Sequence, residues 1–318
     1  MLSAGLIVER RWLTPPICFL YHRVAEASFD PFDLAISPTR FADQLDVMRE
    51  FGDILHAREF DDCLRRGRFP RRAILLTFDD GYEDNLTAAG PALRAAGLPA
   101  TFFLLAPDPV RPSDHFWWET LALAIQSPDW PAIDLLADCL RIGRERARAL
   151  VTPDRNATYL QLYRCFRRLA PKQREHRLRQ LVDSLKQPDT PEPRRLTTGQ
   201  VSALADLPGM TIGSHGQSHE ALFGRKRATV HEELEYSLAH LRAFGERAIE
   251  WFAYPFGCEG RDFDRRDAEL VRRCGFSAAF SVANLNPSTD GFRRFAIPRR
   301  CASEMSLDGL RRFLASFG

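Results

Sequence analysis

The stretch Ala73–Gly81 reads AILLTFDDG and places the run AILLTF directly before two aspartates and a glycine. A short apolar run that ends in a turn signal is typical of a strand buried on both faces, as in a parallel sheet. Active sites of parallel β/α folds gather at the carboxyl ends of their strands. The stretch therefore predicts a buried parallel strand that ends in a pair of carboxylates.

Strands and helices alternate outward from this stretch in both directions. Ser37 directly before Pro38 predicts the N-terminus of a helix that runs to about Phe51. Buried strands are expected at Pro16–Val24, Ala73–Phe78, Ala100–Leu105, Met210–Gly213, Glu250–Tyr254, Ser277–Val282 and Phe295–Pro298. About seven β/α units predict an α/β fold with a closed or nearly closed barrel.

One long segment interrupts this alternation. Residues 111–195 show helical periodicity and no strand signal, so residues 1–110 and 196–318 are predicted to form the barrel around a helical insertion. Residues 141–195 carry 15 Lys and Arg against 6 Asp and Glu, a net charge of +9, whereas the whole chain carries +2. This basic insertion fits an anionic partner, such as a sugar nucleotide, a lipid-linked sugar or a membrane surface. It also fits a solvated helical face, because arginine is abundant throughout the chain.

The composition excludes several other classes of protein. With 318 residues, 45% hydrophobic and 27% charged, the chain has the composition of a globular protein with a large core. Its seven cysteines are an odd number without a C-x-x-C pair, which favours reduced thiols. No leader peptide or membrane span is recognisable, so a cytoplasmic location is expected. Phosphate-binding glycine loops, a G-x-S-x-G elbow and nucleic-acid motifs are absent, and no nucleic-acid partner is expected.

The two aspartates after the central strand can divide two roles. Successive side chains of an extended chain point in different directions, so one of Asp79 and Asp80 can bind a metal while the other faces a substrate. A surface turn is the alternative, because Asp-Gly is a common turn pair.

A second polar motif, GSHGQSH at Gly213–His219, follows another predicted strand. His215 and His219 are four residues apart, about one helical turn, so both imidazoles can converge on one point. Two histidines and a carboxylate with open positions make a hydrolytic or oxidative metal site. With eight histidines in the chain, a chance pair is the alternative.

A third motif, WFAYPFG at Trp251–Gly257, also ends a predicted strand. Its turn, with Tyr254, Pro255 and Phe256, can present a backbone N–H and an aromatic wall to a ligand. An aromatic-proline turn that closes a core is the alternative.

Taken in this order, the three motifs resemble those of the polysaccharide deacetylase family, the NodB-like enzymes of carbohydrate esterase family 4. The family's T-F-D-D-G motif is matched at 77–81, its two metal-site histidines at His215 and His219, and its P-(Y/F)-G motif at 255–257. The resemblance implies a distorted (β/α)7 barrel. It also implies that Asp79 is the general base and that Asp80, His215 and His219 hold a divalent metal. Phe256, next to Pro255 and Tyr254, would bind the oxyanion through its backbone N–H.

The chain departs from the family pattern at three places. Gly216 replaces the Ser or Thr after the first metal-site histidine, so a loop-stabilising hydrogen bond is expected to be lost. Ala253 replaces the arginine that orients the catalytic aspartate, and Arg299 is the expected substitute, with Arg300 as the alternative.

The third departure is the missing L-x-H motif, because no histidine follows position 240. Leu20-Tyr21-His22 instead resembles the motif of circularly permuted deacetylases, including those that act on poly-N-acetylglucosamine. His22 is therefore predicted to be the general acid. A buried histidine at a strand end is the alternative.

The resemblance therefore implies a metal-dependent hydrolase that removes an N-acetyl group from an amino sugar in a glycan or glycan precursor and releases acetate. Zinc is the expected metal, and cobalt, nickel or iron also suit nitrogen and oxygen ligands. Another amide hydrolase, such as a sugar deformylase or a cyclic-amide hydrolase, is one alternative. A non-catalytic carbohydrate-binding relative is the other, since Gly216 and Ala253 depart from the family pattern.

Overall fold

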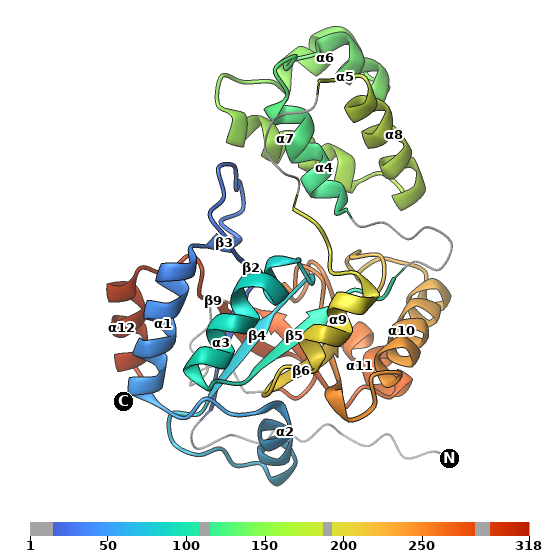
Figure 1. The fold of residues 1–318 in the computed structure, drawn as a ribbon. Coiled ribbons are helices and arrows are strands. Elements are labelled where there is room, and N and C mark those ends of the chain that lie inside the picture. Colours follow the sequence, from blue (N-terminus) through green and yellow to red (C-terminus); the bar gives the residue numbers. More distant parts are fainter. Residues whose placement is uncertain (1–14, 108–114, 187–192, 284–292, 318) are drawn as a thin grey trace. The chain divides into compact units, whose positions relative to one another are not determined.

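The computed structural model describes residues 15–107, 115–186, 193–283 and 293–317. Seven parallel strands close into a barrel in the order β1-β4-β5-β6-β7-β8-β9 (Figure 1), which confirms the predicted α/β barrel. The strands are β1 Ile17–Tyr21, β4 Ile74–Phe78, β5 Ala100–Leu104, β6 Met210–Ser214, β7 Ala248–Ala253, β8 Ala278–Val282 and β9 Ile297–Cys301.

Strand β1 closes the barrel by pairing with two partners. It pairs with β4 from Ile17↔Ile74 to Tyr21↔Phe78 and with β9 through Phe19↔Arg300 and Leu20↔Cys301. The carboxyl ends of β4 and β9 therefore flank the carboxyl end of β1. Residues 220 positions apart in the sequence become neighbours there.

The barrel helices follow the strands along the chain. They are α1 Pro38–Phe51, α2 Ala57–Arg66, α3 Gly90–Ala96, α9 Thr198–Ala205, α10 Arg227–Arg242, α11 Arg265–Cys274 and α12 Leu307–Ala315, with a π-helical turn at Asn85–Ala89 and a 3-10 turn at Gly245–Arg247. At the start of α1 the Ser37 side chain accepts a hydrogen bond from Arg40 N at 3.2 Å, as the Ser-Pro signal predicted.

Alternating side chains of the strands divide the apolar core into two layers. Phe19, Leu76 and other residues of one parity pack with the helices outside the barrel, together with Phe41 of α1. Residues of the opposite parity, such as Leu75 and Trp251, form a separate cluster inside the barrel. Both faces of these strands are therefore buried, which explains their near-continuous apolar sequences.

Helix α2 closes the interior at the amino ends of the strands, and the sequence analysis did not predict it. The ring of Phe60 lies 4.7 Å from Phe69 and 5.6 Å from Trp251, and Trp251 Nε1 donates to Asp61 at 3.1 Å. Phe60 and Leu64 are one helical turn apart and buried, so an apolar spacing was present in the sequence.

Two predicted elements are interrupted in the structure. The strand expected at Pro16–Val24 ends at Tyr21, and Arg23–Val24 (β2) pairs instead with Ala35–Ile36 (β3) in a separate two-stranded sheet. The helical periodicity expected across 111–195 is interrupted between α5 (Ile133–Leu140) and α6 (Arg144–Ala149). The split occurs because Arg141 takes a left-handed conformation, with φ 54°, that ends α5.

The described residues of 27–33 and 112–195 form a second compact unit. It contains α4 (Trp117–Gln126), α5, α6, α7 (Arg155–Arg167) and α8 (Pro171–Asp183). The segment 27–33, which the sequence analysis had assigned to the barrel, joins this unit through its aromatic rings, with Phe32 4.7 Å from Tyr163. The predicted boundary at residues 110 and 111 lies outside the described residues.

None of the helices in the described part of the chain combines the length and apolar character of a membrane span.

Replacement of Phe60 by alanine is expected to lower the free energy of unfolding by about 3–5 kcal/mol, because it opens a cavity in the closed end of the barrel. Urea unfolding measures the change. Phe223→Ala is the matched control, since that ring is 48% exposed, and its effect should stay within about 0.5 kcal/mol. Equal effects of the two variants would contradict the structural role of α2.

Candidate active site

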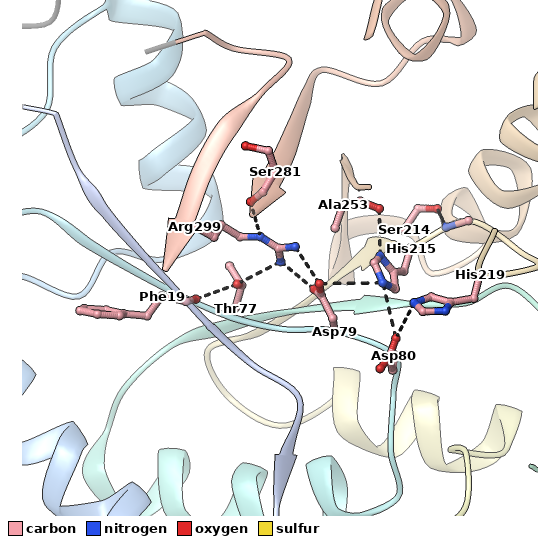
Figure 2. A network of polar contacts seen from close by, with 11 residues as sticks. Phe19, Thr77, Asp79, Asp80, Ser214, His215, His219, Ala253, Ser281 and Arg299 are labelled. Carbon is pink, nitrogen blue, oxygen red and sulfur yellow. Dashed lines mark hydrogen bonds and ion pairs between the residues drawn. The ribbon is translucent and has the colours of Figure 1, made fainter. Parts of the chain in front are cut away.

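A buried ion pair lies at the carboxyl end of the barrel (Figure 2). Arg299 of β9 donates from Nη1 and Nη2 to the two carboxylate oxygens of Asp79, at 2.6 and 2.7 Å. Asp79 is 2% exposed and Arg299 1%, so the pair is almost fully removed from water. This bidentate geometry compensates each charge for its burial and fixes the plane of the carboxylate.

Two further N–H groups of Arg299 are also bound. Its Nε donates to the Ser281 carbonyl at 3.3 Å, and Nη1 also donates to Thr77 Oγ1 at 3.2 Å. Phe103 and Phe280 lie beside the guanidinium, with ring centroids 5.3 and 6.0 Å from Cζ. The guanidinium is therefore held rigidly inside the barrel.

The alternative arginine lies elsewhere. Arg300, the next residue of β9, places its guanidinium 5.4 Å from the ring centroid of Phe313 in α12, outside the barrel. The structure thus brings Arg299 to Asp79, because successive side chains of a strand point to opposite faces.

The ion pair controls the charge of Asp79. Burial opposes ionisation, but the Arg299 guanidinium and the His215 imidazole outweigh it and hold the pKa of Asp79 below its ordinary value. Asp79 is therefore a carboxylate at neutral pH.

Asp80, His215 and His219 converge on one buried point beside this pair (Figure 2). Asp80 Oδ1 lies 3.5 Å from His215 Nε2 and 3.3 Å from His219 Nε2. Ligand atoms held at about 2.1 Å around a tetrahedral ion are about 3.4 Å apart. The two distances therefore match the spacing of ligands around a single metal ion.

Hydrogen bonding shows that these groups fit a cation. His215 Nδ1 lies 2.9 Å from the Ala253 carbonyl, which can only accept, so Nδ1 carries a proton and Nε2 is the ring atom turned to Asp80. Asp80 Oδ1 is buried and has no hydrogen-bond partner within the part of the chain that the structure describes. Burial lowers the pKa of His219 to about 3, which keeps that imidazole neutral and able to coordinate. Two nitrogens and a carboxylate oxygen form a donor set for zinc or a related divalent metal.

Backbone conformation marks the same region. Asp80, His219 and Phe256 have φ angles of 73°, 52° and 62°, a left-handed region that residues other than glycine rarely adopt. Such conformations cost roughly 1–3 kcal/mol each and persist where surrounding contacts impose them. All three residues belong to the motifs that the sequence singled out.

His22 follows the last residue of β1, close to the same carboxylates. An electrostatic interaction with His22 is among the smaller causes of the lowered pKa values of Asp79 and Asp80, so His22 lies near both carboxylates. Its Nδ1 is buried and has no hydrogen-bond partner among the described residues. Asn85 Nδ2 donates to the His22 carbonyl at 2.8 Å and so fixes the backbone at this residue.

Asp84, which the sequence analysis passed over, anchors the adjoining segment. Its Oδ1 accepts from Val24 N at 3.1 Å, and its Oδ2 pairs with Arg23 Nε at 3.0 Å. Together with Asn85 it ties the chain after β1 to the chain after β4. Asp84 lies three residues after the T-F-D-D-G motif. That proximity was the one available signal in the sequence, and no role was assigned to the residue.

The third motif places its residues differently. The Tyr254 hydroxyl donates to the Phe295 carbonyl at 2.9 Å and its ring stacks on Phe263 at 3.7 Å, so its side chain belongs to the core. Pro255 accepts a hydrogen bond from Gly257 N at 2.8 Å in a tight turn. The Phe256 ring lies 4.8 Å from the His219 ring, beside the candidate metal site.

Comparison with known proteins agrees with this geometry. Residues 66–123 and 194–279 match the family model for polysaccharide deacetylase. These segments carry the ion-pair aspartate and all three candidate metal ligands. This match confirms the resemblance to the polysaccharide deacetylase family seen in the sequence.

Solved structures share the fold. IcaB from Ammonifex degensii superposes with a TM-score of 0.56 at 19% identity, over 96% of this chain and 97% of that one. The deacetylase PplD from Streptococcus pyogenes gives 0.55 at 16% identity, over 95% and 97%. The deacetylase domain of BpsB from Bordetella bronchiseptica gives 0.50 at 19%, over 90% and 94%. No curated protein matches the sequence significantly.

Replacement of Arg299 by glutamine is expected to destabilise the fold by about 3–5 kcal/mol at neutral pH, because Asp79 would remain buried without its partner. The effect depends on pH. In the wild type the depressed pKa of Asp79 contributes stability that is present above the carboxyl's unfolded value, about 3.9, and is lost on acidification. In the variant, burial raises that pKa, so stability is lost as pH rises.

The difference in unfolding free energy between the two proteins should therefore widen from pH 4.5 to pH 7.5. Urea unfolding at the two pH values measures this difference, and the contributions of groups that titrate in both proteins cancel. A difference independent of pH would show that Arg299 does not set the charge of Asp79.

Proposed function

We propose that the protein is a metal-dependent glycan N-deacetylase that hydrolyses the acetamide of an acetylated amino sugar and releases acetate. The observation that carries this proposal is the convergence of an ionised, arginine-held Asp79 with Asp80, His215 and His219 inside a polysaccharide deacetylase domain. A carboxylate beside a metal-ligand cluster suits amide hydrolysis by water.

Asp80, His215 and His219 are the residues that would hold the metal, with zinc expected and cobalt, nickel or iron possible by donor type. When bound, such an ion polarises the acyl oxygen and lowers the pKa of its water.

Asp79 acts as the general base in this proposal. Its ionised carboxylate can accept the proton of the attacking water, and Arg299 holds both carboxylate oxygens in place. Because Arg299 supplies the arginine that Ala253 cannot, the main sequence reason for a non-catalytic relative is weakened.

His22 is the proposed general acid for the departing amine. Its position near both aspartates and its fixed backbone support this role. The Phe256 backbone N–H is the proposed oxyanion donor, and the ring contact with His219 keeps that residue beside the site. The deacetylases among the similar structures support an acetylated sugar as the substrate.

Two finer expectations stay predictions. A nucleotide-linked or lipid-linked substrate and contact of the basic insertion with a membrane surface rest on the charge of 141–195 alone. A cytoplasmic location rests on sequence patterns. Assaying acetate, formate and ring-opened products on acetylated and formylated amino sugars separates a deacetylase from the other amide hydrolases.

Asp80→Ala is expected to lose bound metal, whereas Asp79→Asn is expected to keep it and lose activity, by about 10²–10⁴-fold. The reason is that Asp80 faces the imidazole nitrogens, while both Asp79 oxygens are occupied by Arg299. Elemental analysis of the purified variants beside the wild type measures the metal, and acetate release measures turnover. Full activity in Asp79→Asn would remove Asp79 as the base.

His22→Ala is expected to reduce kcat by about 10²–10⁴-fold with little change in metal content, because the leaving amine loses its proton donor. The loss should be smallest on substrates with good leaving groups, such as an acetyl ester of a phenol. Turnover equal to that of the wild type on both substrates would return the acid role to another group.

A further inference from the structure

The loop between the two site histidines is bound to a carboxylate from another element. Glu233 of α10 accepts three hydrogen bonds on Oε1, from Gln217 N at 3.2 Å, Ser218 N at 2.8 Å and Ser218 Oγ at 2.8 Å. Its Oε2 pairs with Arg225 at 2.8 Å. Gln217 and Ser218 directly precede His219, and Arg225 lies in the loop that follows it.

This carboxylate is built into the protein rather than exposed on its surface. The Glu233 side chain is 12% exposed, and Arg225 balances its charge. Hydrogen bonds to an ionised acceptor are roughly twice as strong as those between neutral groups. Glu233 therefore restrains both amides before His219 more firmly than a neutral side chain would.

The restrained amides lead directly into a strained residue. His219 has φ 52°, and this conformation directs its Nε2 to within 3.3 Å of Asp80 Oδ1. A histidine free of restraint would favour the ordinary right-handed or extended regions and carry its imidazole away from Asp80. The bonds to Gln217 and Ser218 oppose that relaxation.

The same carboxylate faces the position where the chain departs from its family. A Cβ added to Gly216 would lie 3.5 Å from Glu233 Oε1, and Gly216 has φ 83°. A side chain at position 216 would therefore contact the Glu233 carboxylate. In this chain, which has no side-chain hydroxyl at Gly216, the loop donates three hydrogen bonds to Glu233 Oε1.

We propose that Glu233, held by Arg225, is a positioning residue that keeps His219 aimed at the metal site by binding the Gln217 and Ser218 amides. This role rests on the proposed metal site. It assigns to α10 the task of orienting a ligand, as groups that hydrogen-bond to metal-bound residues commonly do.

Glu233→Ala tests the proposal through metal affinity and through amide exchange of the metal-free protein. Zn²⁺ affinity, measured by chelator competition, should fall by about 10–100-fold. Amides of 217 and 218 should exchange faster without zinc. Glu235→Gln is the matched control, because Glu235 lies on the same helix, is exposed and pairs with His231 of that helix.

Glu233→Gln separates the carboxylate's charge from its shape and covers the case in which the alanine variant does not fold. The glutamine keeps a carbonyl acceptor but loses the charge. The Zn²⁺ affinity of this variant should therefore lie between that of the wild type and that of Glu233→Ala. If only the glutamine variant folds, its affinity should be several-fold below that of the wild type.

Two results overturn the proposal in distinguishable ways. Wild-type zinc affinity and amide exchange in both Glu233 variants would remove the positioning role and leave the deacetylase proposal standing. A wild-type protein that binds neither Zn²⁺, Co²⁺ nor Ni²⁺ would overturn the metal site and this role together.

Discussion

The buried ion pair between Asp79 and Arg299 is the contact on which the site depends. Neither charge tolerates the barrel interior alone, because each would lose its hydration without compensation. The pair forms only because β1 lies between β4 and β9 and closes the barrel, so that the carboxyl ends of the two flanking strands approach each other. The ionised state of Asp79 therefore depends on closure of the barrel.

Around that pair, the candidate metal site is assembled from loops held in costly conformations. Asp80 and His219 both adopt left-handed backbone. The Ala253 carbonyl orients His215, while Glu233 binds the amides before His219. These contacts hold candidate ligands in place, which would reduce the reorganisation that metal binding requires.

Much of the fold and of the candidate site could be predicted from sequence. The features that were missed all depend on contacts between distant parts of the chain. The strand runs, the helix start at Ser37 and the motif residues are local patterns, and the structure agrees with them. Helix α2 went unpredicted because its apolar residues are few and its role appears only when the barrel's open end needs covering. The break at His22 arises from pairing with Ala35–Ile36 and from Asp84, neither of which is visible in the run Pro16–Val24.

The sequence by itself determined the barrel's strand order along the chain and the identities of the aspartates and histidines, because short-range patterns of apolar and polar residues encode them. Tertiary structure alone decided which arginine meets Asp79 and which carboxylate binds the loop after Gly216. Arg299 and Arg300 are adjacent and chemically identical, and only the facing of β9 separates them. Glu233 is one of several acidic residues on its helix, and only packing of α10 brings its carboxylate to the loop.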